Sequence, residues 1–274
     1  MKVSTATSIL VNYPLNSAIE KVISIGFNGV DMWCGRPHLF RRDYSEESVT
    51  ALGDRIRKNG LNIVSVMPAF YRYPFSLSSP IEPIRLDSIG YMKDCVDNAV
   101  LIGADNVLVV PISRLFDQTP AEARSVFLKS IAEVCEYAEQ KHIKLALEVL
   151  NPQISNFLSK AQHAVDIIKD LKSDNFGIVL DSGHVHLSEE SFEAALDIAF
   201  DRLVNIHIND NDGIEQTNSI PGELSIDFYA LKDTLKEYNY DGFLSLELGY
   251  HYSFDPVNTL TKAISVTKEI FDIN

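Results

Sequence analysis

The sequence has few cysteines and lacks any long hydrophobic run. The three cysteines, Cys34, Cys95 and Cys135, are odd in number and widely spaced, which fits neither a disulfide framework nor a paired thiolate metal site. No apolar stretch approaches the roughly 20 residues that a membrane helix needs, and the first residues lack the apolar core of a signal peptide. We therefore expect a cytoplasmic protein with reduced cysteines and no membrane partner.

Basic residues are also scarce relative to acidic ones. Lys and Arg number 24 against 38 Asp and Glu, so the formal net charge is −14. A chain this acidic repels the phosphates of nucleic acids. Nucleic acid is therefore not an expected partner, whereas the 46% of apolar residue types is ample for a large buried core.

Short runs of β-branched and aliphatic residues alternate with amphipathic helical patterns along the whole chain. The runs that predict strands are Val3–Thr7, Gly29–Trp33, Asn62–Met67, Asn106–Val110, Lys144–Leu150, Phe176–Asp181, Leu203–Ile208 and Phe243–Leu248. The segments that predict helices are Ser45–Lys58, Ser88–Ile102, Ala121–Lys141, Ala161–Leu171, Phe192–Ala199, Phe228–Tyr238 and Val257–Phe271. Repeated β/α units without a linker predict one α/β domain over residues 1–274, a (β/α)₈ TIM barrel. A dinucleotide-binding sheet is disfavoured because no G-x-G-x-x-G turn follows the first strand.

Each of the last four predicted strands carries one ionisable residue near its end. These residues are Glu148, Asp181, His207 and Glu247. Barrel enzymes build their sites at the C-terminal ends of their strands, so we expect the four side chains to converge. Three converging carboxylates would repel one another unless a cation lay among them. The sequence therefore predicts a divalent metal site.

The residue types narrow the choice of metal. Three carboxylates and one imidazole form an oxygen-rich set that suits Mn²⁺, Mg²⁺ or Co²⁺, with Zn²⁺ as a further alternative; our first expectation is Mn²⁺. The residues two positions before each ligand share its strand face, and most of them are small. They are Ala146, Val179, Asn205 and Ser245.

Two short motifs accompany the predicted ligands. They are D-x-x-H at Asp181 and His184 and H-x-x-D at His207 and Asp210. Together with Glu247 they resemble the xylose-isomerase-like TIM-barrel superfamily, in its sugar phosphate isomerase/epimerase branch, and the resemblance covers essentially the whole chain. Residues 32–40 (MWCGRPHLF), 207–213 (HINDNDG) and 220–223 (IPGE) resemble the fructoselysine 3-epimerases more closely than the 3-epimerases of free ketoses.

The resemblance implies a metal-dependent epimerase or isomerase of a ketose or ketose derivative. In the ketose 3-epimerases the residues that match Glu148 and Glu247 bind the metal and also form the acid–base pair, which abstracts a proton beside the C2 carbonyl and passes through an enediolate. The residue that matches His184 contacts a substrate oxygen there. An aldose–ketose isomerase, similar to hydroxypyruvate or xylose isomerases, is the alternative.

Three positions depart from the resemblance. Ile154 stands where the epimerases have a glutamate that grips substrate, and Gly213 stands where the free-ketose enzymes have an arginine. Leu224 replaces a glycine of the loop over the site. Because the far end of the pocket has lost polar groups, we expect a larger ketose derivative, such as an amino-acid-linked fructose, to be preferred over free ketohexoses.

Trp33, Arg36 and His38 are further candidates for substrate contact. The aromatic face of Trp33 could line a sugar pocket or pack in the core. Arg36 and His38 could bind a charged substrate group or belong to an ordinary surface loop.

An aromatic cluster follows the third predicted strand. Three functions fit it equally: a lid, a contact between subunits of a homo-oligomer, or a satellite core. Its members are Phe70, Tyr71, Tyr73 and Phe75.

Two other classes of function compete with an isomerase. A nuclease of the apurinic endonuclease type would need three metal ions, more histidines at the barrel mouth and a basic groove, and this acidic chain has seven histidines in all. A non-catalytic sugar-binding barrel would need ligands but no pair of glutamates for proton transfer.

Overall fold

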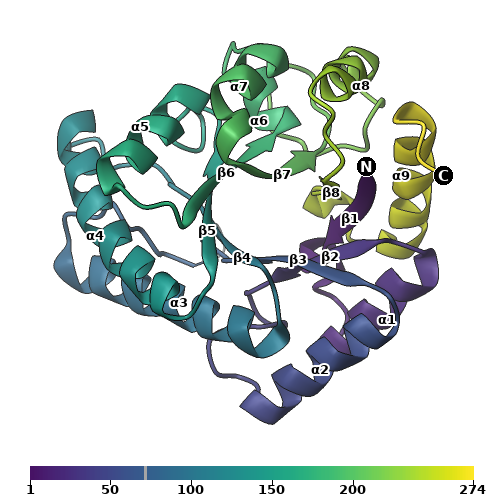
Figure 1. Ribbon diagram of the computed structural model, residues 1–274, viewed down its shortest axis with the longest axis horizontal. Coiled ribbons are helices and arrows are strands. Elements are labelled where there is room, and N and C mark those ends of the chain that lie inside the picture. Colours follow the sequence, from purple (N-terminus) through teal and green to yellow (C-terminus); the bar gives the residue numbers. More distant parts are fainter. Residues whose placement is uncertain (71–72) are drawn as a thin grey trace.

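The computed structural model describes residues 1–70 and 73–274, and its strands close into one parallel barrel (Figure 1). The strands are β1 (Lys2–Ala6), β2 (Gly29–Trp33), β3 (Asn62–Met67), β4 (Asn106–Val109), β5 (Lys144–Val149), β6 (Phe176–Asp181), β7 (Leu203–Ile208) and β8 (Phe243–Leu246). They follow one another around the barrel in chain order, and β8 pairs with β1. The prediction of a (β/α)₈ barrel is confirmed.

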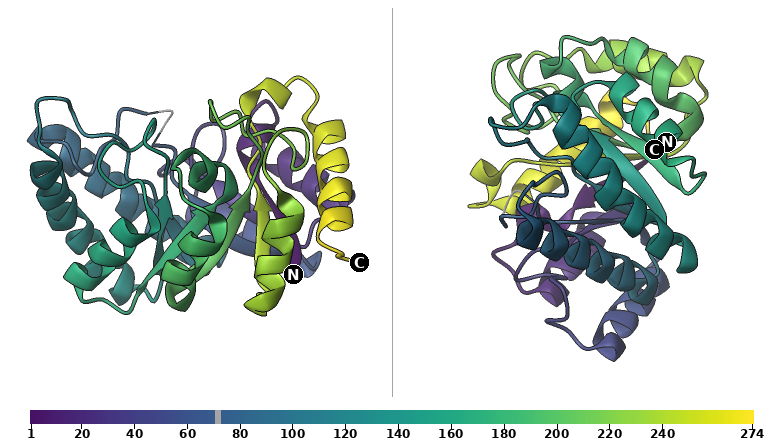
Figure 2. Two further views of the ribbon diagram at one scale, coloured as in Figure 1. Left: turned by 90° about the horizontal axis from the view of Figure 1, so that it is seen from above. Right: turned by 90° about the vertical axis from the view of Figure 1, so that its left-hand side faces the viewer.

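Helices surround the barrel on its outside (Figure 2). They are α1 (Leu15–Ile25), α2 (Glu46–Lys58), α3 (Glu82–Ile102), α4 (Pro120–Gln140), α5 (Ala161–Leu171), α6 (Ser182–Leu187), α7 (Phe192–Ala199), α8 (Phe228–Glu237) and α9 (Pro256–Ile270). Short 3₁₀ turns are η1 (Thr7–Leu10), η2 (Phe200–Arg202) and η3 (Tyr250–Tyr252). Among the helices of the described residues, none is both long and apolar enough to cross a membrane.

Several boundaries differ from the sequence prediction. Helix α3 begins six residues earlier than expected, because Pro83 lies in its first turn, where the missing N–H group breaks no helical bond. Helices α1 and α6 were not predicted; α6 is a short helix whose first turn is capped by Asp181. Strand β8 ends at Leu246, so Glu247 directly follows the strand instead of lying within it.

A polar layer crosses the barrel interior. The carboxylate of Asp31, on β2, accepts hydrogen bonds from Ser65 Oγ at 2.6 Å and Ser4 Oγ at 3.0 Å. Ser4 Oγ lies 2.5 Å from Ser245 Oγ, which in turn accepts from Asn205 Nδ2 at 2.8 Å. All five side chains are buried, and burial raises the pKa of Asp31. Since Ser245 and Asn205 lie two residues before Glu247 and His207 on neighbouring strands, this layer lies directly beneath the predicted ligands.

The aromatic residues after β3 form a satellite core beside the barrel. Phe75 stacks on Tyr91 with ring centroids 4.2 Å apart, and Tyr73 stacks on Phe40 at 4.5 Å. Phe70 packs against both Phe75 and Tyr91. Tyr71, the other aromatic residue of the predicted cluster, lies outside the described residues.

Candidate metal centre and active site

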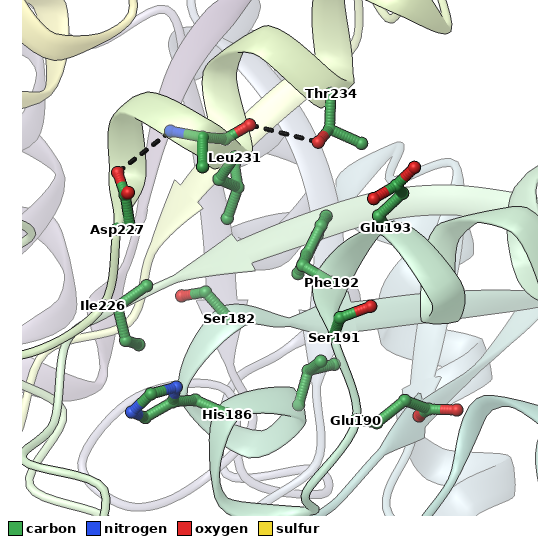
Figure 3. Close-up of a pocket in the computed structure, with 12 residues that line it drawn as sticks. Ser182, His186, Glu190, Ser191, Phe192, Glu193, Ile226, Asp227, Leu231 and Thr234 are labelled. Atoms are coloured by element: carbon green, nitrogen blue, oxygen red, sulfur yellow. Dashed lines mark hydrogen bonds between the residues drawn. The ribbon is translucent and has the colours of Figure 1, made fainter.

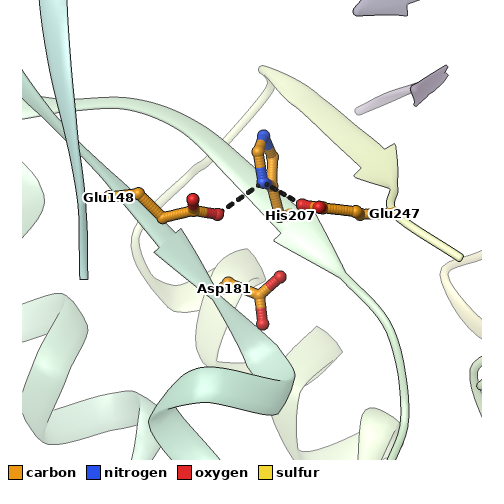
Figure 4. Close-up of side chains that lie close together, drawn as sticks. All are labelled: Glu148, Asp181, His207 and Glu247. Atoms are coloured by element: carbon orange, nitrogen blue, oxygen red, sulfur yellow. Dashed lines mark hydrogen bonds and ion pairs between the residues drawn. The ribbon is translucent and has the colours of Figure 1, made fainter. Parts of the chain in front are cut away.

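The four predicted ligand residues come together at the C-terminal end of the barrel (Figure 4). Glu148 lies near the end of β5, Asp181 ends β6, His207 lies on β7, and Glu247 follows β8. One potential ligand atom from each lies within 4.8 Å of all the others. Neighbouring strands place them at similar heights, since Asp181 and His207 are direct partners in the β6–β7 register.

The imidazole of His207 lies between the two glutamates. Its Nδ1 atom is 2.8 Å from Glu148 Oε1 and 3.0 Å from Glu247 Oε2. The side chains of His207 and Glu148 are 1% and 4% exposed, whereas that of Glu247 is 24% exposed. The cluster is therefore closed on the side of Glu148 and open on the side of Glu247.

Burial controls the charge of this cluster. Burial, reinforced by the charge of Glu247, raises the pKa of Asp181 to about 7, and burial raises the pKa of Glu148 as well. Burial also opposes ionisation of Glu247, but the hydrogen bond and charge of His207 outweigh it and lower the pKa of Glu247. For His207, the cost of burial is exceeded by the charges of Glu148 and Glu247, and its pKa is raised. One histidine thus balances the three carboxylates incompletely.

A divalent cation fits this donor set. Ligand atoms on opposite sides of an ion lie about 4.2 Å apart when each bond is about 2.1 Å, and about 4.8 Å apart when each is about 2.4 Å, which matches the spacing within the cluster. A cation would also neutralise the carboxylates that His207 leaves uncompensated. Carboxylate oxygens and one imidazole nitrogen are ligands that Mn²⁺ and related ions accept.

His184 lies beside the cluster in α6 and is buried. Its Nδ1 atom accepts the backbone N–H of Asn151 at 3.2 Å. A nitrogen that accepts carries no proton, so the neutral ring carries its proton on Nε2. Burial lowers the pKa of His184 against the opposing charges of Glu148 and Glu247, which favours this neutral form.

A cavity of about 560 Å³ opens at the barrel mouth beside the cluster. Of the residues predicted from sequence, Trp33, His184 and Glu247 line it. Ile154, one of the departures from the resemblance, forms part of its wall. The cavity therefore joins one predicted metal ligand, Glu247, to two of the predicted substrate contacts, Trp33 and His184.

Other residues of the cavity wall were missed by the sequence analysis. They are Ser8, Glu215, Gln216, Thr217, Asn218, Ser219, Leu248, Gly249, Tyr250 and His251. Most belong to the loops after β7 and β8, where no strand or helix period shows which side chains face inward. His251 is out of phase with the strand ligands, so its position in the sequence does not indicate a place in the cavity wall.

Arg36 and His38 are not among the residues that line this cavity. The guanidinium of Arg36 forms a bidentate pair with Asp43, at 2.6 and 2.9 Å. The ring of His38 is fully buried, with Nδ1 3.2 Å from Thr7 Oγ1 and Nε2 3.2 Å from the carbonyl of Tyr13. Both residues already have protein partners, and their contact with substrate stays a prediction.

Asp210, the last residue of the H-x-x-D motif, anchors the loop after β7. It is fully buried, and its two carboxylate oxygens accept backbone N–H groups from Asn211, Gly222, Leu224 and Ile226 at 2.8–3.0 Å. These bonds fold the loop that carries Glu215 and Gln216 over the cavity. The H-x-x-D motif therefore supplies both a predicted metal ligand, His207, and a buried anchor for the loop, Asp210.

A second pocket, of about 240 Å³, lies between α6, α7 and α8 (Figure 3). It includes His186, whose Nε2 lies 3.1 Å from Ser225 Oγ. Acidic residues Glu190, Glu193 and Asp227 also line it, but none of the four predicted ligands does. This pocket is separate from the metal cluster.

Comparisons with known proteins agree with the fold. Fructoselysine 3-epimerase from Shigella flexneri is 25% identical over 243 residues, which is 89% of this chain and 88% of that protein. Among solved structures, the apo form of 3-keto-D-glucoside 4-epimerase, YcjR, from E. coli superimposes with a TM-score of 0.83 at 19% identity, covering 98% of this chain and 99% of the other. D-Psicose 3-epimerase with D-tagatose from Clostridium cellulolyticum H10 gives a TM-score of 0.79 at 19% identity, covering 99% of both chains.

The predicted resemblance is confirmed at the level of the family. A model of the xylose isomerase-like TIM barrel matches residues 19–270, and the relatives in this group include sugar epimerases. The buried Glu, Asp, His and Glu cluster lies where a barrel of this kind has its site. This chain therefore belongs to the xylose isomerase-like TIM barrel family.

Proposed function

We propose that this protein is a divalent-metal-dependent epimerase that inverts the carbon beside the C2 carbonyl of a ketose or ketose derivative. The observation that carries the proposal is the placement of Glu148 and Glu247, which approach His207 from opposite sides (Figure 4). Two carboxylates on opposite faces of a substrate can remove a proton from one face and return one to the other. The placement of the two glutamates therefore supports inversion of that carbon.

Glu148, Asp181, His207 and Glu247 would hold the metal ion, for which Mn²⁺ is the first candidate and Mg²⁺, Co²⁺ and Zn²⁺ are the alternatives. When bound, the ion would polarise the substrate carbonyl and so acidify the neighbouring C–H bond. The glutamates supply the proton transfers themselves. The greater exposure of Glu247 gives it direct access to the cavity.

The remaining contacts orient the sugar. The proton on Nε2 of neutral His184 can be donated to a substrate oxygen, because Nδ1 is occupied by the N–H group of Asn151. The indole of Trp33 lines the same cavity and offers an apolar face to the C–H surface of a sugar. The role of His184 is the one that the family resemblance implies.

The wall of the cavity supports a substituted ketose as substrate. Ile154 contributes an apolar surface to this wall, whereas Gly213 is not among the residues that line the cavity. Glu215 lines the cavity with a carboxylate, which would pair with an amino group on the substituent. Since the Shigella flexneri relative is a fructoselysine 3-epimerase, we propose an amino-acid-linked fructose as the substrate.

Isotope exchange tests this proposal. The Mn²⁺-loaded protein is incubated in D₂O with fructoselysine and, separately, with free fructose, tagatose and psicose. Deuterium at C3 with inversion, faster for the derivative than for the free ketoses, is the expected result. Deuterium at C1 would instead identify an aldose–ketose isomerase. Fastest turnover of a free ketohexose would refute the substrate assignment alone, and no exchange with any sugar in the presence of metal would refute the epimerase.

A further inference from the structure

Three side-chain amides connect the metal cluster to His184. Asn209 Nδ2 donates to Asp181 Oδ2 at 2.6 Å. Gln216 Nε2 donates to Asn209 Oδ1 at 3.2 Å, and Asn151 Nδ2 donates to Gln216 Oε1 at 3.1 Å. Asn151 Nδ2 also lies 2.9 Å from His184 Nδ1. The chain of amides thus runs from a predicted metal ligand to the predicted substrate contact.

The direction of these hydrogen bonds is fixed at both ends. Asn151 Oδ1 accepts the backbone N–H groups of Gln153 at 2.8 Å and Ile154 at 3.2 Å, so its Nδ2 must face the other way. At the far end, a carboxyl group that binds a metal ion must be deprotonated. As such a ligand Asp181 can only accept, so Asn209 must present its Nδ2 there and its Oδ1 to Gln216.

Gln216 is the residue whose amide satisfies both neighbours at once. Its Oε1 accepts from Asn151, while its Nε2 donates to Asn209 Oδ1 and to Asn218 Oδ1, the latter at 2.7 Å. Both amide protons are therefore used, and both are directed at acceptors. A carboxylate of the same size at this position could accept but could not donate.

Gly183 leaves room for the side-chain amides of Asn209 and Gln216. A Cβ atom at Gly183 would lie 2.1 Å from Asn209 Oδ1 and 2.8 Å from Gln216 Nε2. Only glycine fits between Ser182 and His184 while the amides keep these positions. The glycine of this D-x-x-H motif is thus explained by the packing of Asn209 and Gln216 against it.

We propose that Gln216 is a positioning residue of the active site: its amide holds Asn209 in the orientation that donates to Asp181 and holds Asn151 against His184. Outer groups that orient metal ligands commonly change metal affinity by about 10–100-fold when they are lost. The inference rests on the metal site of the proposed function. It adds that a residue of the loop after β7 sets the geometry of that site.

Cobalt binding tests the inference without substrate. The variants are Gln216→Glu, which keeps the acceptor for Asn151 but loses both donors, and Gln216→Met, which removes every polar contact. Gln153→Glu is the matched control. Gln153 Nε2 donates at 2.7 Å to the carbonyl of Ile214, which lies in the same loop as Gln216, but the amide of Gln153 is not bonded to a predicted metal ligand. Each protein is first prepared folded and free of metal. Co²⁺ is then added, and its affinity and the visible absorption of the bound ion are measured.

The expected result is Co²⁺ affinity lowered about 10-fold or more in both Gln216 variants, with an altered absorption band, and affinity and band unchanged in Gln153→Glu. Unchanged affinity and spectrum in both Gln216 variants would overturn this inference and leave the proposed function intact. Equal losses in Gln153→Glu would also overturn it, since the effect would then come from the loop as a whole. Failure of the unaltered protein to bind Co²⁺ would overturn the metal site and this inference together.

Discussion

At the residue scale, Glu148 and Glu247 are the same type of side chain, but their surroundings shift their pKa values in opposite directions. Both contact the same nitrogen of His207. Glu148 is closed off from solvent, and its pKa is raised by burial. Glu247 borders the cavity, and His207 lowers its pKa despite burial. Two carboxyl groups whose surroundings shift their pKa values in opposite directions are typical of an acid–base pair.

Replacing either glutamate by glutamine should separate binding from turnover. Glu148→Gln and Glu247→Gln retain the shape of the side chain but cannot transfer a proton, so we expect kcat to fall by about 100-fold or more. Calorimetry should still detect binding of the substrate. Glu193→Gln, on the exposed surface of α7, is the control and should keep normal kcat. Near-normal turnover in either active-site variant would exclude the two-carboxylate mechanism.

At the element scale, each of the strands β5–β8 brings one ligand to the same end of the barrel. This part of the site could be predicted from sequence, because Glu148, Asp181 and His207 interrupt apolar strands about once per β/α unit. The positions of Gln216 and His251 could not be predicted, since they depend on how the loops after β7 and β8 fold. Those loops are held by contacts such as Asp210 to Ile226, which span 16 residues and follow no local period.

The buried carboxylate in the barrel interior was missed for a different reason. Asp31 interrupts β2 in the same manner as the ligands interrupt their strands, but its partners Ser4, Ser65 and Ser245 are ordinary residues in the sequence. These hydrogen bonds form only because the closed barrel places β1 and β3 beside β2 and places β8 beside β1.

Replacing Asp210 by asparagine should release the loop after β7. In the unaltered protein both carboxylate oxygens of Asp210 accept backbone N–H groups, and asparagine replaces one of these oxygens by an NH₂ group, which cannot accept. A lost hydrogen bond to a charged group costs about 1.5–3 kcal/mol. We expect faster limited proteolysis within residues 211–227 and a higher KM, with the circular dichroism of the barrel retained. Asp212→Asn should show neither change, because Asp212 is exposed and accepts the N–H groups of Ile214 and Glu215 through Oδ1 alone, an acceptor that asparagine keeps. Protection of the loop equal to that of the unaltered protein would contradict the anchoring role of Asp210.

At the scale of the whole molecule, metal binding and folding should be linked. The ligands stand on four strands that meet only in the closed barrel, so a metal ion held by all four stabilises the folded state. Mn²⁺ at about 100 times its Kd should raise the free energy of unfolding by about 2.7 kcal/mol. Thermal unfolding measured with Mn²⁺ and with a chelator provides the test.

Asp181→Ala and His207→Ala are the variants for this comparison. Both should lose most of the stabilisation by Mn²⁺ while the metal-free proteins still fold, because the ligands lie at the end of the barrel that serves function. Stabilisation by Mn²⁺ as large as in the unaltered protein would mean that the ion binds elsewhere.

The ligands all lie in the second half of the chain, on β5 to β8, and this has a consequence for divergence among descendants of such a barrel. Mutations in the loops after β1 to β4 can alter length and composition without touching a ligand. Trp33 and Ser8 line the cavity from that half and are not part of the cluster. Substitutions at Trp33 and Ser8 would therefore reshape one side of the cavity and leave the four residues of the cluster in place.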